Sequence, residues 1–327
     1  MALQAFDWQG IRLVPSGFFE TVVANRSVPA GGSVSTRFGS LPLTGSGGEW
    51  LASARHSRMR FDAGKALWGG TISAYIETDF MTANPGDMIR FRQYYGQYSY
   101  GKWEVSAGRE WSLLRPNRVG ISSRSDHMHT LVADPAYHVG LAGVRDRQVR
   151  VVRHDGNWHF AASFENGKDF LSKVVHDGKR LHWELIGVAG KEGHHGASLA
   201  YTWKAHSRLT LVGQHYMARG GGKDALGTAP ASVLAKSNIV GAEIKGPLKF
   251  QLYGYSGFVH ADRSAGNRMV RQSTTGFLRS IAKDAFGEAT VDFQYSRLDR
   301  SVWSGQQGQM NLVMVSLRHT LAVPHAE

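Results

Sequence analysis

Several short segments of the chain place an arginine or a carboxylate at every second position. A guanidinium group forms two hydrogen bonds to a carboxylate or phosphate and keeps its proton at physiological pH. Residues two apart lie on one face of a β-strand, so such segments would align fixed charges along one surface. The chemistry indicated is recognition of small anions. The side chains concerned are Arg58, Arg60, Glu77, Asp79, Arg90, Arg92 and Arg150, with Tyr94 in phase with Arg92.

Residues that could support catalysis or hold a metal ion are present without a suitable arrangement. The chain has no Cys, and its Ser and His residues lie in no nucleophile-elbow frame. His194 and His195 are adjacent, and neither this pair nor His127 and His129 has a carboxylate at metal-ligand spacing. The glycine run from Gly220 lacks phosphate-loop spacing. We therefore expect loop histidines, no metal, no cofactor and no enzymatic activity.

The elements that carry these residues are predicted to be β-strands. Convincing amphipathic helices are absent, and segments of about ten residues alternate apolar with polar side chains. Such alternation gives each strand one apolar and one polar face. Clear examples are residues 72–80, 157–165, 248–253 and 291–296.

The separators between these segments allow the strands to be counted. Hairpins that alternate between a short turn and a long loop require residues 169–175 to form a strand, which gives seven turns, eight loops and sixteen strands. The short turns are expected at 63–67, 100–101, 154–156, 176–179, 204–207, 245–247 and 282–286. The other connections are expected at 27–49, 81–87, 113–136, 166–168, 190–195, 219–235, 260–269 and 298–307.

An even number of ten-residue antiparallel strands is typical of a transmembrane β-barrel of the outer membrane. We expect about 16 strands, with 14 or 18 as alternatives, short periplasmic turns and long extracellular loops. Aromatic residues near predicted strand ends agree with interfacial girdles, although they would also pack a soluble β-sandwich. These aromatic residues are Trp68, Trp103, Trp158, Trp183 and Trp203.

The barrel is expected to occupy residues 10–321, after a lead-in of residues 1–9 and before a tail of residues 322–327. The first ten residues lack the charged start and apolar core of a signal peptide. The chain is thus either cytoplasmic or, as we expect, a Gram-negative outer-membrane protein whose signal was removed.

Several stretches resemble the DcaP-like family of trimeric Gram-negative porins. The resemblance covers the N-terminal half in order and spacing, while the C-terminal half agrees only in pattern. It implies a 16-stranded homotrimeric porin that passes small anionic solutes such as dicarboxylates. The matching stretches are GIRLVPSGFFETVV (10–23), SRMRFDA (57–63), YIETDF (75–80), RFRQYYGQY (90–98), VSAGREWSLL (105–114) and DPAYHVGLAGVRDRQVRV (134–151).

In such a barrel the charged face of each strand should point to the lumen. Arg or Lys facing lipid at the bilayer midplane costs roughly 2–4 kcal/mol, so the apolar neighbours must point outward. The first half would then carry a ladder of arginines faced by Glu77 and Asp79. The alternative is that these arginines only neutralise the carboxylates and line a non-selective pore.

The connection 113–136 is expected to fold into the lumen as a constriction. Its Arg115, Arg118 and Arg124 would then add a positive rim faced by Asp126. The alternative is a solvated extracellular loop. Separately, three arginines fall in phase with outward apolar residues, so a bulge or a subunit interface is needed to accommodate them. These are Arg109, Arg145 and Arg147.

The charge balance fits this interpretation better than a nucleic-acid-binding one. The 38 Lys and Arg against 26 Asp and Glu give a net charge of +12, spread over the chain without an RNA-binding aromatic signature. We expect a porin in contact with outer-membrane lipid and lipopolysaccharide, and no nucleic-acid partner. The competing functions are a non-selective porin, a barrel hydrolase and a soluble β-rich binding protein.

Overall fold

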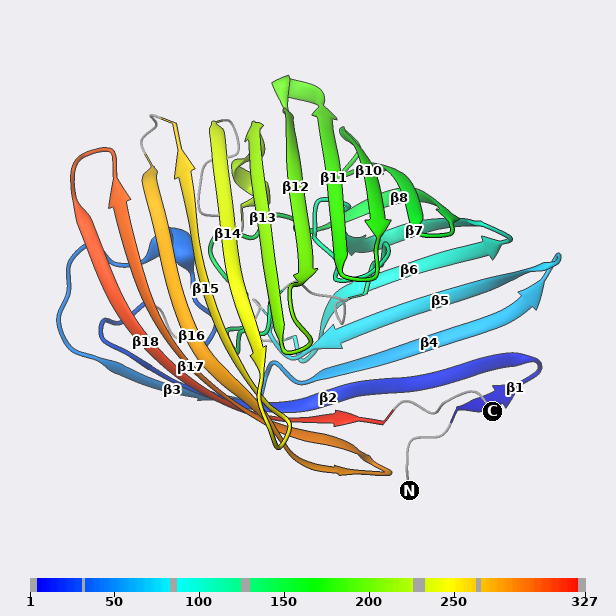
Figure 1. Ribbon diagram of the computed structural model, residues 1–327, viewed down its shortest axis with the longest axis horizontal. Coiled ribbons are helices and arrows are strands. Elements are labelled where there is room, and N and C mark those ends of the chain that lie inside the picture. Colours follow the sequence, from blue (N-terminus) through cyan, green and yellow to red (C-terminus); the bar gives the residue numbers. More distant parts are fainter. Residues whose placement is uncertain are drawn as a thin grey trace.

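The computed structural model describes residues 5–30, 33–82, 87–124, 130–225, 233–262 and 266–322. An 18-stranded antiparallel sheet closes on itself, and two short strands outside the ring leave a barrel of 16 strands (Figure 1). Among the described residues, no helix is long and apolar enough to cross a membrane. The ring consists of β2 (Ile11–Arg26), β4 (Arg58–Leu67), β5 (Gly70–Asp79), β6 (Arg90–Tyr100), β7 (Trp103–Trp111), β8 (Arg145–Asp155), β9 (Trp158–Glu165), β10 (Asp169–Asp177), β11 (Leu181–Gly190), β12 (His195–Lys204), β13 (Leu209–Arg219), β14 (Leu234–Lys245), β15 (Phe250–Ala261), β16 (Asn267–Asp284), β17 (Gly287–Val302) and β18 (Gln307–Leu321).

Short turns and longer loops alternate around the ring as predicted. Short turns follow β4, β6, β8, β10, β12, β14 and β16, and the longer connections lie at the other end. The last strand pairs with the first, with Leu312 opposite Arg26 and Thr320 opposite Phe18. This pairing closes the barrel and confirms the sixteen-strand count.

One weak prediction is confirmed, and several predicted connections are shorter than expected. Residues 282–284 and 298–302, predicted in connections, continue β16 and β17. The segment predicted at 169–175 is β10, paired on both sides. Residues 63–67 were expected to form a turn but continue β4, and the turn consists of Trp68 and Gly69. Both have positive φ, 50° and 75°. This backbone is the one that a two-residue hairpin requires, because its twist matches that of the flanking strands.

Two short strands outside the ring pair with parts of β2 that its neighbours in the ring leave unpaired. β1 (Phe6–Trp8) pairs with its beginning, and β3 (Glu49–Ser53) pairs with its end on the edge that β4 occupies further along. Between β3 and β4 the chain leaves the sheet at residues 54–57, where Ser57 accepts a hydrogen bond from the backbone of Glu20 at 3.0 Å. This interruption brings His56 into the barrel interior, where it is buried.

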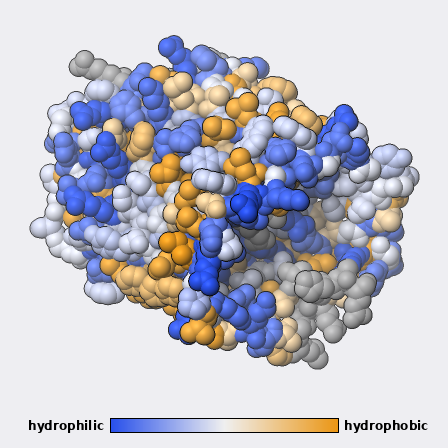
Figure 2. All heavy atoms as spheres, in the orientation of Figure 1, coloured by the Kyte–Doolittle hydropathy of each residue, from blue (hydrophilic) through white to orange (hydrophobic). Residues whose placement is uncertain are grey.

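The two faces of the wall differ as the alternation predicts. Polar side chains on the inner face are mostly buried by loops that fill the barrel, while the outer face exposes apolar side chains, and polar and apolar residues intersperse on the visible surface (Figure 2). Trp103, Trp158 and Trp203 are exposed near the turn end, as a girdle requires. Exposed apolar residues include Phe61, Phe91, Val105, Val149, Phe160, Phe164, Phe170, Leu185, Leu199, Leu252, Phe293, Val315 and Leu317.

Two long connections fold into the barrel. In the first, which joins β2 to β3, Val34, Phe38 and Leu41 pack against an apolar stretch of the inner wall. This stretch includes Leu312 and Met314. The sequence did not predict this stretch, because a porin lumen is usually polar. The second connection, residues 112–144, packs Leu113, Leu114 and Ile121 against β8 to β11 and β13. Its described part therefore lies in the lumen.

Inward-facing glutamines hold the second connection to the wall through its backbone. Gln214, Gln272 and Gln294 each accept a hydrogen bond from a backbone N–H of this loop, at 2.7–2.9 Å. The backbones also touch directly: a Cβ on Gly257 would lie 2.0 Å from the Val139 carbonyl oxygen, and one on Gly140, with φ of 96°, would lie 2.0 Å from that of Asn238. No side chain fits between loop and wall here.

We expect Gly257→Ala to lower the free energy of unfolding by about 1–3 kcal/mol, because the added methyl group forces the loop off the wall. Urea unfolding of the barrel in detergent, followed by tryptophan fluorescence, measures this. Gly64→Ala is the control, since the nearest atom to its Cβ is 3.9 Å away. Equal losses in the two variants would contradict the close contact.

Candidate functional site: an arginine cluster inside the barrel

Six of the predicted side chains meet on the inner faces of β4, β5 and β6. The register places Arg60 opposite Glu77, Arg58 opposite Asp79, and Asp79 opposite Arg90. Glu77 lies 3.0 Å from the Arg60 Nε, and Asp79 lies 2.6 Å from an Arg90 Nη. The strand alternation therefore brings the ladder together as the sequence predicts.

Arg92 joins the two carboxylates. Its Nε donates to Glu77 at 2.8 Å and its Nη1 donates to Asp79 at 2.6 Å. Glu77 is 0% exposed, and Arg58 approaches it within 3.7 Å. Burying a carboxylate is costly unless it is paired and hydrogen-bonded. Four guanidinium groups thus surround two carboxylates, which leaves an excess of positive charge.

Tyr94 lies on the opposite face from the one predicted. Between β5 and β6 the register shifts by one residue, so that Arg92 and Gln93 are both buried. Such a β-bulge reverses the side-chain phase beyond it. Tyr94 is consequently 40% exposed on the outer wall, with its ring edge against Phe91, and it does not belong to the cluster.

Arg150 is buried on the inner face of β8, as predicted. Its Nη1 donates to Ser123 at 2.7 Å and lies 3.6 Å from Glu110, and its Nη2 donates to Gln148 and to the Trp111 carbonyl. These partners lie on two strands and on the loop. Arg150 therefore fastens the loop to the wall.

Two arginines of the inward loop pair with wall carboxylates. Arg118 donates two hydrogen bonds to the Glu243 carboxylate on β14, one of them at 2.9 Å. Arg124 donates to Asp62 on β4. The two contacts lie on different sides of the barrel, so the loop spans the lumen between them. The charge of both arginines is locally balanced. Asp126, predicted to face them, lies outside the described residues.

Arg115 and Arg145 pack on an aromatic pair formed by Trp111 and Tyr137. Both guanidinium groups stack on Trp111 at 4.9 Å, and Arg115 also lies 4.6 Å above Tyr137. The Tyr137 hydroxyl accepts a hydrogen bond from Arg92 at 3.0 Å. Arg145, whose direction the sequence left open, thus points inward. Its Nη1 is buried and has no hydrogen-bond partner among the described residues.

The other two arginines left open by the sequence point outward. Arg109 pairs across strands with Tyr94 on one side and Arg147 on the other, so all three lie on one face of the wall. Arg147 is exposed and Arg109 is half-buried. Neither forms an ion pair or a side-chain hydrogen bond within the described part of the chain.

The arginines change the acidity of Tyr137, which lies in the loop. Burial opposes ionisation of the phenol, but the positive charges of Arg92, Arg58, Arg145 and Arg115 outweigh it and lower the pKa of Tyr137 to about 7. Tyr137 also has φ of 72°, an uncommon value for a residue with a side chain. The fold thus holds a readily ionised oxygen among four guanidinium groups.

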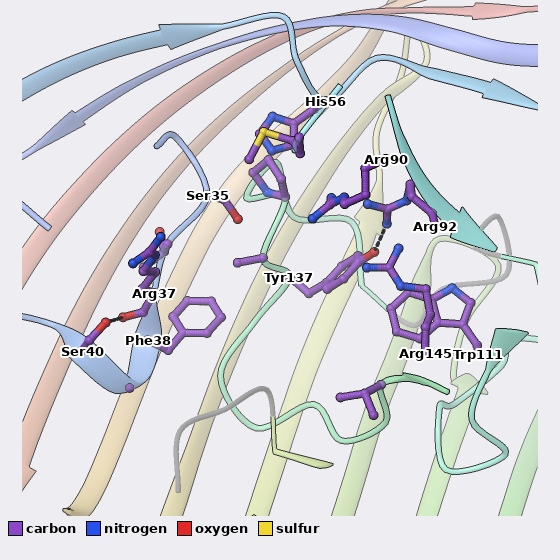
Figure 3. A pocket seen from close by; sticks show the side chains of 16 residues that line it. Ser35, Arg37, Phe38, Ser40, His56, Arg90, Arg92, Trp111, Tyr137 and Arg145 are labelled. Atoms are coloured by element: carbon purple, nitrogen blue, oxygen red, sulfur yellow. Dashed lines mark hydrogen bonds between the residues drawn. The ribbon is translucent and has the colours of Figure 1, made fainter. Parts of the chain in front are cut away.

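A cavity of about 550 Å³ opens beside this cluster. The guanidinium groups of Arg90, Arg92 and Arg145 point toward Tyr137 on one side, and Arg37 and Phe38 lie opposite (Figure 3). This arrangement provides donors for an anion next to aromatic surface. Sequence spacing could not identify the roles of Tyr137, Trp111 or Arg37, because they come from loops and a strand end that only the fold brings together.

Two histidines have environments that the sequence did not predict. Burial lowers the pKa of His56, which lines the cavity, to about 4, although the Glu20 and Asp79 carboxylates oppose the shift. His194 was expected in a surface loop but is buried, because its ring binds Asp169 at 2.8 Å and Asp224 at 3.2 Å. His195 is exposed as expected.

The structure describes neither histidine of the pair His127 and His129, and a metal site can be sought only among the described residues. Within the described ranges, no group of three or more His, Cys, Asp or Glu side chains is placed to hold a metal ion.

No family model and no curated protein matches the chain, but solved structures do. The outer membrane channel DcaP of Acinetobacter baumannii is 15% identical with a TM-score of 0.81, over 98% of this chain and 100% of that one. OmpT, an outer membrane protein of Vibrio cholerae in trimer form, gives 12% and 0.62, over 95% and 100%. A Rhodopseudomonas blastica porin triple mutant gives 12% and 0.54, over 94% and 100%. The chain therefore has the fold of outer-membrane β-barrel porins.

We expect Tyr137 to ionise at about pH 7, well below an ordinary phenol, because four arginines favour its anion. Ultraviolet difference titration of the barrel against Tyr137→Phe isolates its phenolate signal. Arg145→Gln should move the midpoint to higher pH, since one stabilising charge is lost. A difference spectrum with no ionisation near neutrality would contradict the charge cluster.

Proposed function

We propose that this protein is an outer-membrane porin through which small hydrophilic anions diffuse passively. The observation that carries the proposal is the excess of guanidinium groups over carboxylates around the cavity. Arg58, Arg60, Arg90 and Arg92 all pair with the two carboxylates of Glu77 and Asp79. Arg115 and Arg145 add positive charge over aromatic rings. Fixed positive charge in a narrow, water-filled passage concentrates anions and repels cations.

The geometry favours solutes that carry more than one acceptor group, such as dicarboxylates. Arg90, Arg92 and Arg145 project into one side of the cavity and Arg37 lies on the other. A molecule with acceptors at both ends would contact both sides. Arg145 supports this proposal further, because its buried Nη1 has no hydrogen-bond partner among the described residues and can donate to a solute. If carboxylates neutralised all of these arginines, the pore would instead be non-selective.

We expect Arg145→Gln to lower the anion-to-cation permeability ratio by a factor of about 3 or more, since a unit charge beside the path is worth on the order of 1 kcal/mol. The reversal potential in a planar bilayer under a KCl gradient measures this ratio. Arg147→Gln is the matched control: it removes the same charge two residues away, on the outer wall.

Three outcomes would contradict the proposal. Absence of single-channel steps from the folded protein would exclude a channel. A wild-type reversal potential at zero would leave a non-selective pore. Equal effects of the two substitutions would mean that the cavity does not lie on the permeation path. Lipid hydrolysis abolished by a single His substitution would favour the alternative of a barrel hydrolase, because this proposal assigns the chain no enzymatic activity.

We further propose that the porin is a homotrimer embedded in outer-membrane lipid, with lipopolysaccharide on the loop side. An apolar groove of about 560 Å³ crosses the outer wall of β4 to β7. Its floor is a cross-strand row of small residues, Ala63, Ala74, Gly96 and Ala107. The neighbouring cross-strand row includes Arg109, whose charge would be costly to expose to lipid. Contact with a second copy would cover both features.

We expect Ala74→Trp to convert the trimer to a monomer, because the indole fills the groove. Light scattering after size exclusion in detergent reports the molar mass. The control is Ala162→Trp on the outer face of β9, between Phe160 and Phe164, which should leave the mass unchanged. A trimer in both variants, or in neither, would place the interface elsewhere.

A further inference from the structure

Much of the positive charge of this protein lies outside the lumen. Most arginines of the interior contact carboxylates, whereas the short turns after β10, β12 and β14, with the strand ends beside them, carry exposed basic residues. None of these side chains forms an ion pair or hydrogen bond within the described residues. They amount to six positive charges against a net charge of +12 for the chain. They are Lys179, Arg180, Lys204, Arg208, Lys245 and Lys249, here called the basic rim.

The basic rim is continuous, because backbone hydrogen bonds join neighbouring turns. The Lys204 N–H donates to the Arg180 carbonyl at 2.7 Å, and the Lys245 N–H donates to the Arg208 carbonyl at 2.8 Å. The nearby carboxylates of the described residues have other partners: Asp177 is occupied by His159, His182 and the Gly120 N–H, and Glu243 by Arg118. The six cations therefore form one arc without a compensating carboxylate.

Apolar side chains lie at the strand ends immediately beside this arc. Leu181 and Trp203 are cross-strand partners, and Leu209 and Ile244 are partners on the next pair of strands. Trp203, Leu181 and Ile244 are exposed on the outer wall. In a bilayer this level is the boundary between hydrocarbon and headgroups, where aromatic residues gather.

The β14–β15 turn extends the apolar band into the arc itself. Leu248 is 79% exposed, and both Leu248 and Lys249 have left-handed backbones, with φ of 54° and 56°. This conformation is uncommon for residues with side chains and costs free energy. It holds an exposed leucine beside an exposed lysine at the edge of the barrel. An apolar group next to a cation complements an acyl chain next to a phosphate.

We propose that the basic rim is a binding surface for anionic phospholipids of the leaflet on the turn side, with the phosphates on the six cations and the acyl chains on the neighbouring apolar band. This inference is independent of the ion selectivity of the pore. Lys and Arg at a membrane surface each contribute about 1 kcal/mol toward anionic lipid, or a factor of about 5 in affinity. A soluble acidic partner would use the charge but leave the apolar band uncovered.

The test compares phosphatidylglycerol with phosphatidylcholine on the intact barrel. Spin-labelled lipids of both headgroups, in vesicles of phosphatidylcholine, give the relative association constant at the protein surface. The rim variant carries Lys204→Gln, Arg208→Gln, Lys245→Gln and Lys249→Gln. The matched control removes four exposed charges near the loop end of the outer wall, namely Lys191→Gln, Arg219→Gln, Lys236→Gln and Arg271→Gln.

We expect the wild type to prefer phosphatidylglycerol several-fold, and the rim variant to lose most of that preference while the control retains it. Leu248→Gln, which keeps every charge, should weaken retention of both lipids. Heat-modifiable migration on gels verifies that each variant is folded. Equal losses in rim and control variants, or no preference in the wild type, would overturn the proposal. Competition by soluble polyglutamate that matches the lipid would also overturn it, because charge alone would then explain the binding.

Discussion

Closure of the sheet is the constraint on which the other features of this molecule depend. Backbone N–H and C=O groups in hydrocarbon find no water, so a sheet in a membrane must leave no edge, and here β18 pairs with β2. A ring of sixteen strands encloses more space than its inward side chains fill. Two connections therefore fold inside, and the second one meets the arginine cluster of β4, β5 and β6 through Tyr137, which accepts a hydrogen bond from Arg92.

Features that follow from strict alternation could be predicted from the sequence. The sixteen strands and the meeting of Arg58, Arg60 and Arg92 with Glu77 and Asp79 need only the period of two and antiparallel pairing. The inward position of Arg150 follows in the same way. These are local properties, because each strand repeats the same choice between lumen and membrane at every residue.

Features that depend on a departure from alternation could not be predicted. The bulge at Arg92 and Gln93 joins two polar residues, so nothing in the sequence marks the change of phase that turns Tyr94 outward. Arg145 begins its strand and turns inward onto Trp111, against its apparent phase. The apolar inner wall around Leu312 makes sense only once the loop that covers it is known.

The direct contact of Gly140 and Gly257 with the opposing backbone has a consequence for how such proteins diverge. Two touching main chains have no rotamers to change, so the distance of the loop from β14 and β15 is fixed by peptide geometry. The side chains that give the cavity its charge, such as Arg145, come from other positions. The seat of the loop on the wall and the charge of the cavity are consequently encoded by separate residues, so that evolution is free to alter one while the other stays constant.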